Sequence, residues 1–101
     1  MELRHLRCLV AIVDAGGFTD AAIDLGLSQA AVSRTLGSLE DFLGVRLLHR
    51  TSRSASPTTA GVHVLARARK VLAEADNLIR TLPLAPEVPL PAPSRRIGPR
   101  P

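Results

Sequence analysis

Three apolar stripes with helical spacing, each followed by glycine, fill the first part of the chain and constrain its fold more than any other feature. They predict a helix from about Glu2 to Ala15, a short helix over 20–25 and a third helix from Gln29 to about Leu43. Glycine ends a helix because it adopts the left-handed backbone conformation without strain. The glycines that follow the stripes are Gly16, Gly17, Gly26 and Gly44.

The composition fits a small helical core and excludes several classes of protein. Hydrophobic residues make up 46% of the 101 residues and aromatic residues only 2%, so the core must be aliphatic, which favours helices over a large sheet. Cys8 is the single cysteine, which predicts a core position and a reducing compartment. No apolar run reaches the ~20 residues that cross a bilayer, and no signal peptide is evident, so we expect a cytoplasmic protein without membrane contact.

A helix-turn-helix is indicated by three positions in the second and third helices. Ala22 is small enough for two helices to approach closely, Gly26 allows the sharp bend between them, and Val32 packs back on the first helix of the pair. Thr19 and Ser28 stand where an N-cap side chain would begin each helix. The spacing alone is moderately specific, because many helical pairs contain alanine and glycine by chance.

The outer face of the third helix suits the major groove of DNA. It is short and polar, and it carries no acidic residue before Glu40. Glutamine can bond adenine edges, arginine can bond guanine or phosphate, serine can do either, and alanine can touch a thymine methyl. The outward residues are Gln29, Ala30, Ser33, Arg34 and Gly37. An ordinary solvated face is the alternative, but such faces usually carry lysine and glutamate.

A basic segment follows where a wing would lie. Residues 45–50 and 55–57 predict two short strands of a hairpin, which must lean on the helices because a lone hairpin is unstable. Arg50, Thr51 and Arg53 fall near its tip, where arginine can reach phosphates or a narrow minor groove. The net charge of +4 agrees with an anionic partner, although a basic cluster standing alone also fits a solvated loop.

A long fourth helix is predicted from Thr58 or Thr59 to about Leu82, with Pro83 ending it. Its heptad seam consists of Val64, Ala68, Val71, Ala75, Leu78 and Leu82, and a second stripe of Leu65, Leu72 and Ile79 flanks the seam. A helix of about 24 residues is ~36 Å long, which exceeds the width of so small a domain, so the seam predicts a dimer interface. The alternative is that the seam packs on the first helix alone.

Residues 83–101 hold seven of the eight prolines and show no helical or strand period. Proline removes backbone donors and forbids helix, so we expect an extended or disordered tail that adds nothing to the fold. The predicted organisation is a DNA-binding domain over 1–61, a linker and dimerisation helix over 58–82, and the tail over 83–101.

A set of short motifs runs through residues 1–82 in a specific order and spacing. The motifs are Leu3-Arg4-His5-Leu6, Gly17-Phe18-Thr19, Ala21-Ala22, Leu25, Leu27 to Arg34, Leu39-Glu40, Leu43 to Leu48, Arg50-Thr51 and Thr58 to Gly61. By these residues the segment resembles the N-terminal domain of LysR-type transcriptional regulators. The resemblance implies a mainly α winged helix-turn-helix, with a three-helix core, a two-stranded wing and a long C-terminal dimerisation helix. It also implies that Gln29, Ser33 and Arg34 meet the major groove.

The outer face and the resemblance together give the candidate contacts of a homodimer with double-stranded DNA. They are Ser28, Gln29, Ala30, Ser33, Arg34 and Ser38 on the recognition helix, and Thr19, Arg50, Thr51, Arg53 and Thr58 on the second helix and wing. The family often has proline or serine where this chain has Ala30, which affects helix initiation and one base contact. Family members normally continue into a ligand-sensing α/β domain, for which this chain leaves no room. We therefore expect no small-molecule effector site, and a fragment, a truncated product or a naturally short regulator.

Two other functions compete with sequence-specific DNA binding. A chain that keeps the seam could pair with full-length relatives and antagonise them, although its groove-compatible face argues against a purely antagonistic role. An enzyme is disfavoured because His5, His49 and His63 are scattered, and because the sequence has neither a glycine-framed nucleophile turn nor a phosphate-binding glycine loop. We therefore expect no catalytic residue, metal or cofactor.

Overall fold

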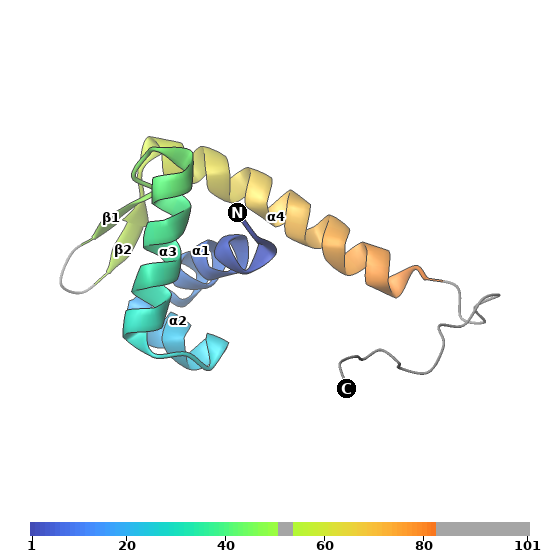
Figure 1. Ribbon diagram of the computed structural model, residues 1–101, viewed down its shortest axis with the longest axis horizontal. Helices are drawn as coiled ribbons and strands as arrows, with labels where there is room; N and C mark the ends of the chain where they lie inside the picture. The colour runs from blue at the N-terminus through green and yellow to red at the C-terminus, as the bar shows by residue number, and fades with distance from the viewer. Residues whose placement is uncertain (51–53, 83–101) are drawn as a thin grey trace, which may run out of the picture.

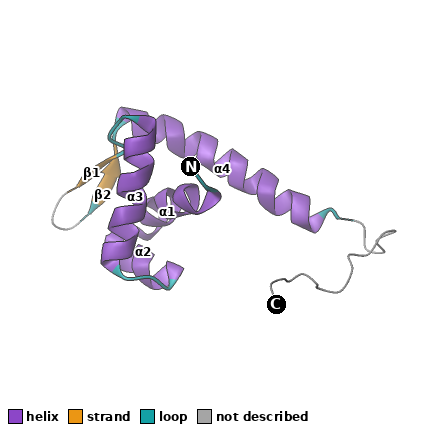
Figure 2. Ribbon diagram, in the orientation of Figure 1, coloured by secondary structure: helices purple, strands orange, loops and turns teal. Residues whose placement is uncertain are grey.

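In the computed structural model, which describes residues 1–50 and 54–82, the described chain forms four helices and one two-stranded antiparallel sheet (Figure 2). The elements are α1 (Leu3–Ala15), α2 (Phe18–Leu25), α3 (Gln29–Leu43), β1 (Leu48–Arg50), β2 (Ala55–Pro57) and α4 (Thr59–Arg80). Helices α1 to α3 form a compact body beside the β1–β2 hairpin, and α4 extends away from it as a long rod (Figure 1). The predicted fold class is confirmed.

Local signals set the ends of the first three helices. The glycines at the C-terminal ends of α1, α2 and α3 all adopt the left-handed conformation, with φ of 86°, 68° and 74° at Gly16, Gly26 and Gly44. At the other end of α3, the Ser28 hydroxyl oxygen accepts a hydrogen bond from the N–H of Ala31 over 3.0 Å, so the predicted cap is confirmed. These ends depend on residues only a few positions apart.

The predicted start of α2 is wrong by two residues. Gly17 is the N-cap, in an extended conformation, and Thr19 lies inside the first turn of the helix. The side chain of Phe18, the first helical residue, is half-buried against the core. Burial of this large side chain starts the helix two residues earlier than a cap at Thr19 would place it, so tertiary packing overrides the capping preference.

The core is aliphatic and joins the helices to the hairpin. Its largest fully buried side chains include Leu9, Ile12, Val32, Leu36, Leu39, Leu47 and Leu48. The predicted core position of Cys8 is confirmed, because the residue is 2% exposed and its thiol donates to the Val32 carbonyl oxygen over 3.5 Å. Burial raises the pKa of the Cys8 thiol, which keeps the sulfur protonated and unreactive.

The hairpin is shorter than its sequence suggests. Its cross-strand pairs are Leu48–Pro57, His49–Ser56 and Arg50–Ala55. The strand predicted over 45–47 is wrong, because the backbone at Leu47 bonds elsewhere: its N–H donates to a Glu40 carboxylate oxygen over 2.8 Å, and its carbonyl oxygen accepts from the N–H of Thr58 over 2.9 Å. The first strand therefore begins only at Leu48.

Helix α4 begins where predicted and lies directly on the segment that leads into β1. The Thr58 hydroxyl oxygen caps the helix by accepting the N–H of Gly61 over 2.9 Å. A Cβ atom on Gly61 would overlap the carbonyl oxygen of Leu47, so only glycine lets the two backbones approach this closely. The contact fixes the start of α4 to the base of the hairpin.

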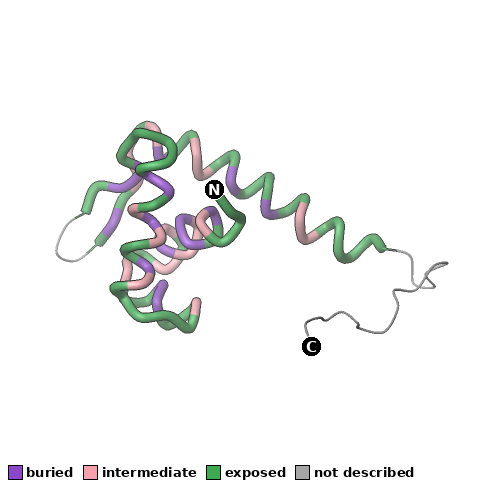
Figure 3. The backbone as a smooth tube through the Cα atoms, viewed as in Figure 1, coloured by how far each residue is buried: buried purple, intermediate pink, exposed green. Residues whose placement is uncertain are grey.

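The two halves of α4 have different surroundings (Figure 3). In the packed half (residues 59–72), Ala68 is 2% exposed and Leu72 is 8% exposed, and both belong to the core. In the projecting half (residues 73–80), Leu78 is 65% exposed and Ile79 is 67% exposed. Part of the length of α4 is therefore covered by its own chain and part is not.

The last turn of α4 ends at Arg80, two residues before the predicted end. The Thr81 hydroxyl donates to the carbonyl oxygen of Asn77 over 2.8 Å, and Leu82 precedes a proline, which disfavours helical backbone at Leu82. The tail predicted over 83–101 lies outside the described residues. No helix in the described part of the chain is long and apolar enough to span a membrane.

Candidate nucleic-acid interface

Helix α3 buries one face and exposes the other. Val32 and Leu36 are 0% exposed, and Leu39 is 1% exposed. The residues of the opposite face that the sequence predicted to contact DNA are all exposed, namely Gln29, Ala30, Ser33, Arg34 and Ser38. The predicted orientation of the helix is confirmed.

Two of the candidate residues are joined across the helix-turn-helix. The Gln29 side-chain nitrogen Nε2 donates to the Thr19 hydroxyl oxygen over 2.9 Å. The bond ties the first turn of α2 to the first turn of α3 and orients the Gln29 amide. The Ser28 hydroxyl oxygen, by contrast, is occupied by the helix cap, so its role in the described structure is to begin α3.

One flank of α3 is cationic. A hollow of about 360 Å³ separates α3 from the start of α1, and its lining includes Arg4, His5 and Arg34 but no carboxylate. Arg4 does pair with Glu2 over 2.6 Å, which lowers the pKa of the Glu2 carboxyl, but both side chains are about two-thirds exposed and such a pair is weak. This flank therefore presents positive charge and hydrogen-bond donors next to the outer face of α3.

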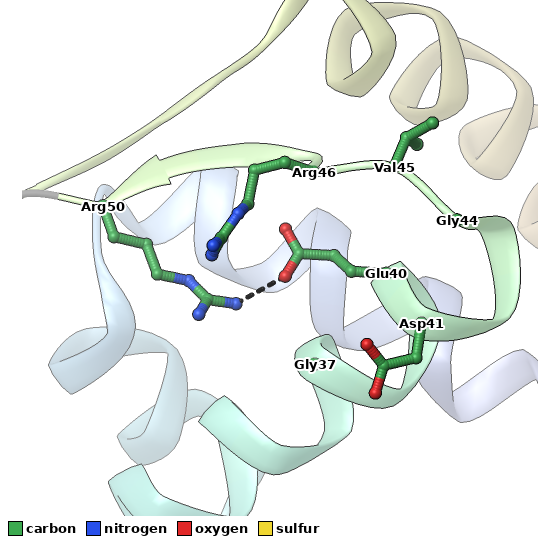
Figure 4. Close-up of a pocket in the computed structure, with 7 residues that line it drawn as sticks. All are labelled: Gly37, Glu40, Asp41, Gly44, Val45, Arg46 and Arg50. Carbon is green, nitrogen blue, oxygen red and sulfur yellow. Dashed lines mark hydrogen bonds and ion pairs between the residues drawn. The ribbon is translucent and has the colours of Figure 1, made fainter.

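The other flank of α3 faces the base of the hairpin (Figure 4). A hollow of about 510 Å³ lies there, and the side chains of Glu40, Arg46 and Arg50 converge on it. Glu40 is 8% exposed, and an ion pair of 2.7 Å joins its Oε1 to the Arg50 guanidinium. The Arg50 guanidinium also lies over the Phe18 ring, 5.6 Å from the ring centre. This flank is held together by internal bonds.

Glu40 is the residue that sequence reasoning missed. The sequence predicts only an acid that bounds the outer face, whereas the structure buries Glu40. Its Oε2 accepts the N–H of Leu47 over 2.8 Å and the N–H of Leu48 over 3.4 Å. The sequence contains one indication of this burial: Glu40 lies four residues after Leu36, which places it beside the apolar stripe of the helix.

The wing residues predicted to contact DNA have mixed outcomes. Arg50 is engaged by Glu40, and its side chain is 33% exposed. The Thr58 hydroxyl donates to the Arg46 carbonyl oxygen over 2.7 Å while it caps α4, so its one hydrogen is used internally. In the described structure Thr58 therefore has a structural role, and its contact with DNA stays a prediction. Thr51 and Arg53 lie outside the described residues.

The predicted dimer seam divides in the structure. Ala68 is buried by its own chain, so it belongs to the core and has no surface to offer a partner. Val64 and Ala75 are half-buried, and Val71, Leu78 and Leu82 are exposed. Leu65 and Leu72 of the flanking stripe also pack on the body. A hollow of about 170 Å³ between α1, α3 and α4 opens beside Val64 and Val71.

Metal-binding potential is absent from the described residues, among which no group of three or more His, Cys, Asp or Glu side chains is placed to hold an ion. Of the histidines, His5 serves the backbone: its Nδ1 accepts the N–H of Glu2 over 2.9 Å and caps α1.

Comparison with known proteins identifies the family. Residues 3–62 match the family described as bacterial regulatory helix-turn-helix protein, lysR family. The chain is 43% identical over 84 residues to the probable HTH-type transcriptional regulator LrrA of Synechococcus elongatus, which covers 83% of this chain and 29% of that protein. It is 42% identical over 79 residues to the HTH-type transcriptional regulator BenM of Acinetobacter baylyi, covering 78% and 26%. The chain thus spans under a third of the length of these curated relatives.

Solved structures show the same fold. The DNA-binding domain of BenM in complex with catB site 1 DNA superposes with a TM-score of 0.75 at 41% identity, over 79% of this chain and 86% of that one. The CbnR DNA-binding domain in complex with DNA superposes with a TM-score of 0.76 at 38% identity, over 79% and 92%. The chain therefore belongs to the LysR family of bacterial regulatory helix-turn-helix proteins, whose matched region is a DNA-binding domain.

Proposed function

We propose that this chain binds double-stranded DNA as a sequence-specific transcription regulator, with α3 in the major groove and the wing against the backbone or the minor groove. The observation that carries the proposal is the exposed outer face of α3, which presents Gln29, Ser33 and Arg34 and no acidic residue over its first two turns. The DNA complexes of the similar BenM and CbnR domains support it. Bacterial DNA lies in the cytoplasm, which is the compartment we propose.

We propose further that the chain acts as a homodimer through α4. Val71 is 45% exposed and Leu78 is 65% exposed, and both lie on one stripe of the helix. An apolar stripe of this kind is costly in water and is covered when two helices pair. A two-fold dimer would set two copies of α3 against two half-sites, so the operator should be roughly palindromic.

The test is DNA binding by the purified chain over a range of salt concentrations. We expect Arg34→Ala to weaken binding by about 1–3 kcal/mol and to relax the preference at one base position, because arginine reads guanine edges. Arg53→Ala should weaken binding to all sequences alike. Each lost phosphate contact should lower the log–log salt slope by about 0.9.

Arg80→Ala is the matched control, because it removes the same charge from the far end of α4. Affinity that does not depend on salt, or that is the same in wild type and Arg34→Ala, would contradict the proposal.

The second candidate is an antagonist that pairs with full-length relatives through α4. The exposed stripe that includes Val71 and Leu78 favours it, since a related helix would cover that stripe as well as a second copy would. The two functions separate in one measurement: a regulator shifts DNA alone, whereas a pure antagonist shifts none and lowers the DNA binding of a full-length relative added to it.

A further inference from the structure

A buried carboxylate lies beside the surface that we propose binds a polyanion. Glu40 is 8% exposed and sits on α3, the proposed recognition helix. A carboxylate near phosphates is repulsive unless it is neutralised, and a buried charge is costly unless it is fully bonded. The presence of a buried carboxylate at this position therefore needs a structural or functional explanation.

The hydrogen bonds of this carboxylate lead to β1 and to the residue just before it, and Figure 4 shows the one to Arg50. Oε2 accepts the backbone N–H of Leu47 over 2.8 Å and that of Leu48 over 3.4 Å, and Oε1 accepts the Arg50 guanidinium over 2.7 Å. These donors lie just before, at the start of and at the end of β1, whose bounds are Leu48–Arg50. One side chain of α3 thus fixes both ends of the strand.

The guanidinium extends the connection to a third element. Arg50 lies over the ring of Phe18, 5.6 Å from its centre, and Phe18 is the first residue of α2. We name Glu40, Arg50 and Phe18 together the wing clamp. It links α3, β1 and α2.

We propose that Glu40 and Arg50 are positioning residues: the clamp sets where the wing stands relative to the recognition helix, and Arg50 serves the clamp instead of binding a DNA phosphate. The proposal rests on the proposed function, because a wing position matters only to a DNA-binding chain. It replaces the direct phosphate contact that the sequence suggested for Arg50. The adjacent Glu40 charge neutralises the guanidinium, so Arg50 adds little net attraction for a phosphate.

The chain provides a matched control for charge. Arg46 lines the same hollow as Glu40 and Arg50, and its guanidinium makes no ion pair with any described residue. Arg46→Gln therefore removes a positive charge from the same place without opening the clamp. It reports how much a nearby cation contributes through its field alone.

The sign of the Glu40→Gln effect decides between the two roles of Arg50. If Arg50 bound phosphate directly, removing the neighbouring carboxylate would free the cation and leave DNA affinity unchanged or tighter. If Glu40 and Arg50 position the wing, Glu40→Gln and Arg50→Gln each weaken binding by about tenfold, the equivalent of one good contact at about 1.4 kcal/mol. The double variant is then no weaker than the weaker single variant, because both changes open the same clamp.

The experiment measures the dissociation constant for one preferred duplex, at several salt concentrations, for the wild type, the two Gln variants, the double variant and Arg46→Gln. The wing clamp is supported if Glu40→Gln and Arg50→Gln lose the same DNA affinity and have the same salt slope, and if this loss of affinity exceeds that of Arg46→Gln. Unchanged or tighter binding by Glu40→Gln, or additive losses in the double variant, overturn it. A wild type that fails to bind DNA overturns the proposed function instead, and is seen before any variant is compared.

A measurement on the wild type keeps the clamp testable if Glu40→Gln fails to fold, which circular dichroism would reveal. The guanidinium NH signals of Arg50 are followed by NMR as the duplex is added. If the wing clamp persists in the complex, the Arg50 guanidinium signals keep the chemical shifts of the free protein, because the bond to Glu40 is retained. A large shift of those signals together with a phosphorus coupling would place a phosphate on Arg50 and overturn the proposal.

Discussion

The packed and projecting halves of α4 follow one apolar pattern but have opposite surroundings. Leu72 and Ile79 are seven residues apart on the same stripe, yet Leu72 is 8% exposed and Ile79 is 67% exposed. The difference arises because α1 has 13 residues and α4 has 22, so the body ends before the helix does. An apolar stripe therefore predicts that one face of a helix is buried. It does not predict whether the same chain or a partner buries it.

The two neighbouring apolar stripes of α4 are covered to different extents by the body. Leu65 and Leu72 of one stripe pack on the body, as does Ala68 of the neighbouring seam, while Val71 and Leu78 of the seam remain exposed. Ion pairs on the α1 side, Arg69–Asp14 at 2.6 Å and Arg7–Asp76 at 3.2 Å, flank the packed stripe. This division should be visible in the free energy of unfolding of the single chain.

The largest loss is expected from Gly61→Ala at the start of the packed half. The added Cβ would overlap the Leu47 carbonyl oxygen, so α4 must shift away from the hairpin, at a cost of about 3 kcal/mol. Chemical denaturation followed by circular dichroism measures it. Gly37→Ala in α3 is the control, because its added Cβ meets nothing within 4 Å and should be neutral or slightly stabilising. Similar stabilities of the two variants would show that α4 is not seated on Leu47.

A smaller loss is expected from Leu72→Ala, about 2–3 kcal/mol, because the side chain is buried in the core and its removal leaves a cavity. Leu78→Ala makes the same chemical change on the projecting half and should alter the single chain by less than about 0.5 kcal/mol. Both are measured at a protein concentration low enough to keep the chain monomeric. Equal losses at the two positions would erase the distinction between the halves.

Asp14→Asn should cost less than about 1 kcal/mol at neutral pH, because the Asp14 and Arg69 side chains are about half exposed and solvent screens the pair. The hydrogen bond from Arg69 lowers the pKa of the Asp14 carboxyl in the folded chain. The stabilisation from the Asp14–Arg69 pair is therefore fully present above about pH 3.9, the pKa of an aspartate in the unfolded chain. It is lost as the pH falls through the lower pKa of Asp14 in the folded chain. Unfolding curves of wild type and variant should differ at pH 7 and converge in strong acid. If the difference in stability between wild type and variant persists or widens in acid, the Asp14–Arg69 pair is not its source.

The smallest change in single-chain stability, under about 0.5 kcal/mol, is expected from Val71→Asp with Leu78→Asp, because both positions are exposed. Their effect should appear in assembly: sedimentation should show a wild-type dimer, which the double variant splits with loss of DNA affinity. Lys70→Asp with Asn77→Asp adds acid to the same helix outside the seam and is the control. A wild type that stays monomeric at tens of micromolar would remove the dimer proposal.

Much of the fold could be predicted because its signals are local. Glycine after each stripe and serine before α3 act within one turn of the chain, so the ends of α1 and α3 agree with prediction to within one residue. The exposed face of α3 follows from the same reasoning, since the inward position of Val32 and Leu36 leaves Arg34 outward. Where prediction failed locally, at Thr19, packing of Phe18 moved the boundary.

The helix-turn-helix, the residues of its outer face and the apolar stripe on α4 can all be read from the order of residues, because each depends on spacing along one element. The burial of Glu40 beneath the wing, the internal bonds of Arg50 and Thr58, and the length of α4 that the body covers became known only from the folded chain. Those outcomes depend on pairs far apart in the chain, such as Arg69 with Asp14 and Leu47 with Gly61. Burial and hydrogen bonding of a residue depend on which distant segments of the chain pack against it. The spacing of residues along one element does not specify those segments.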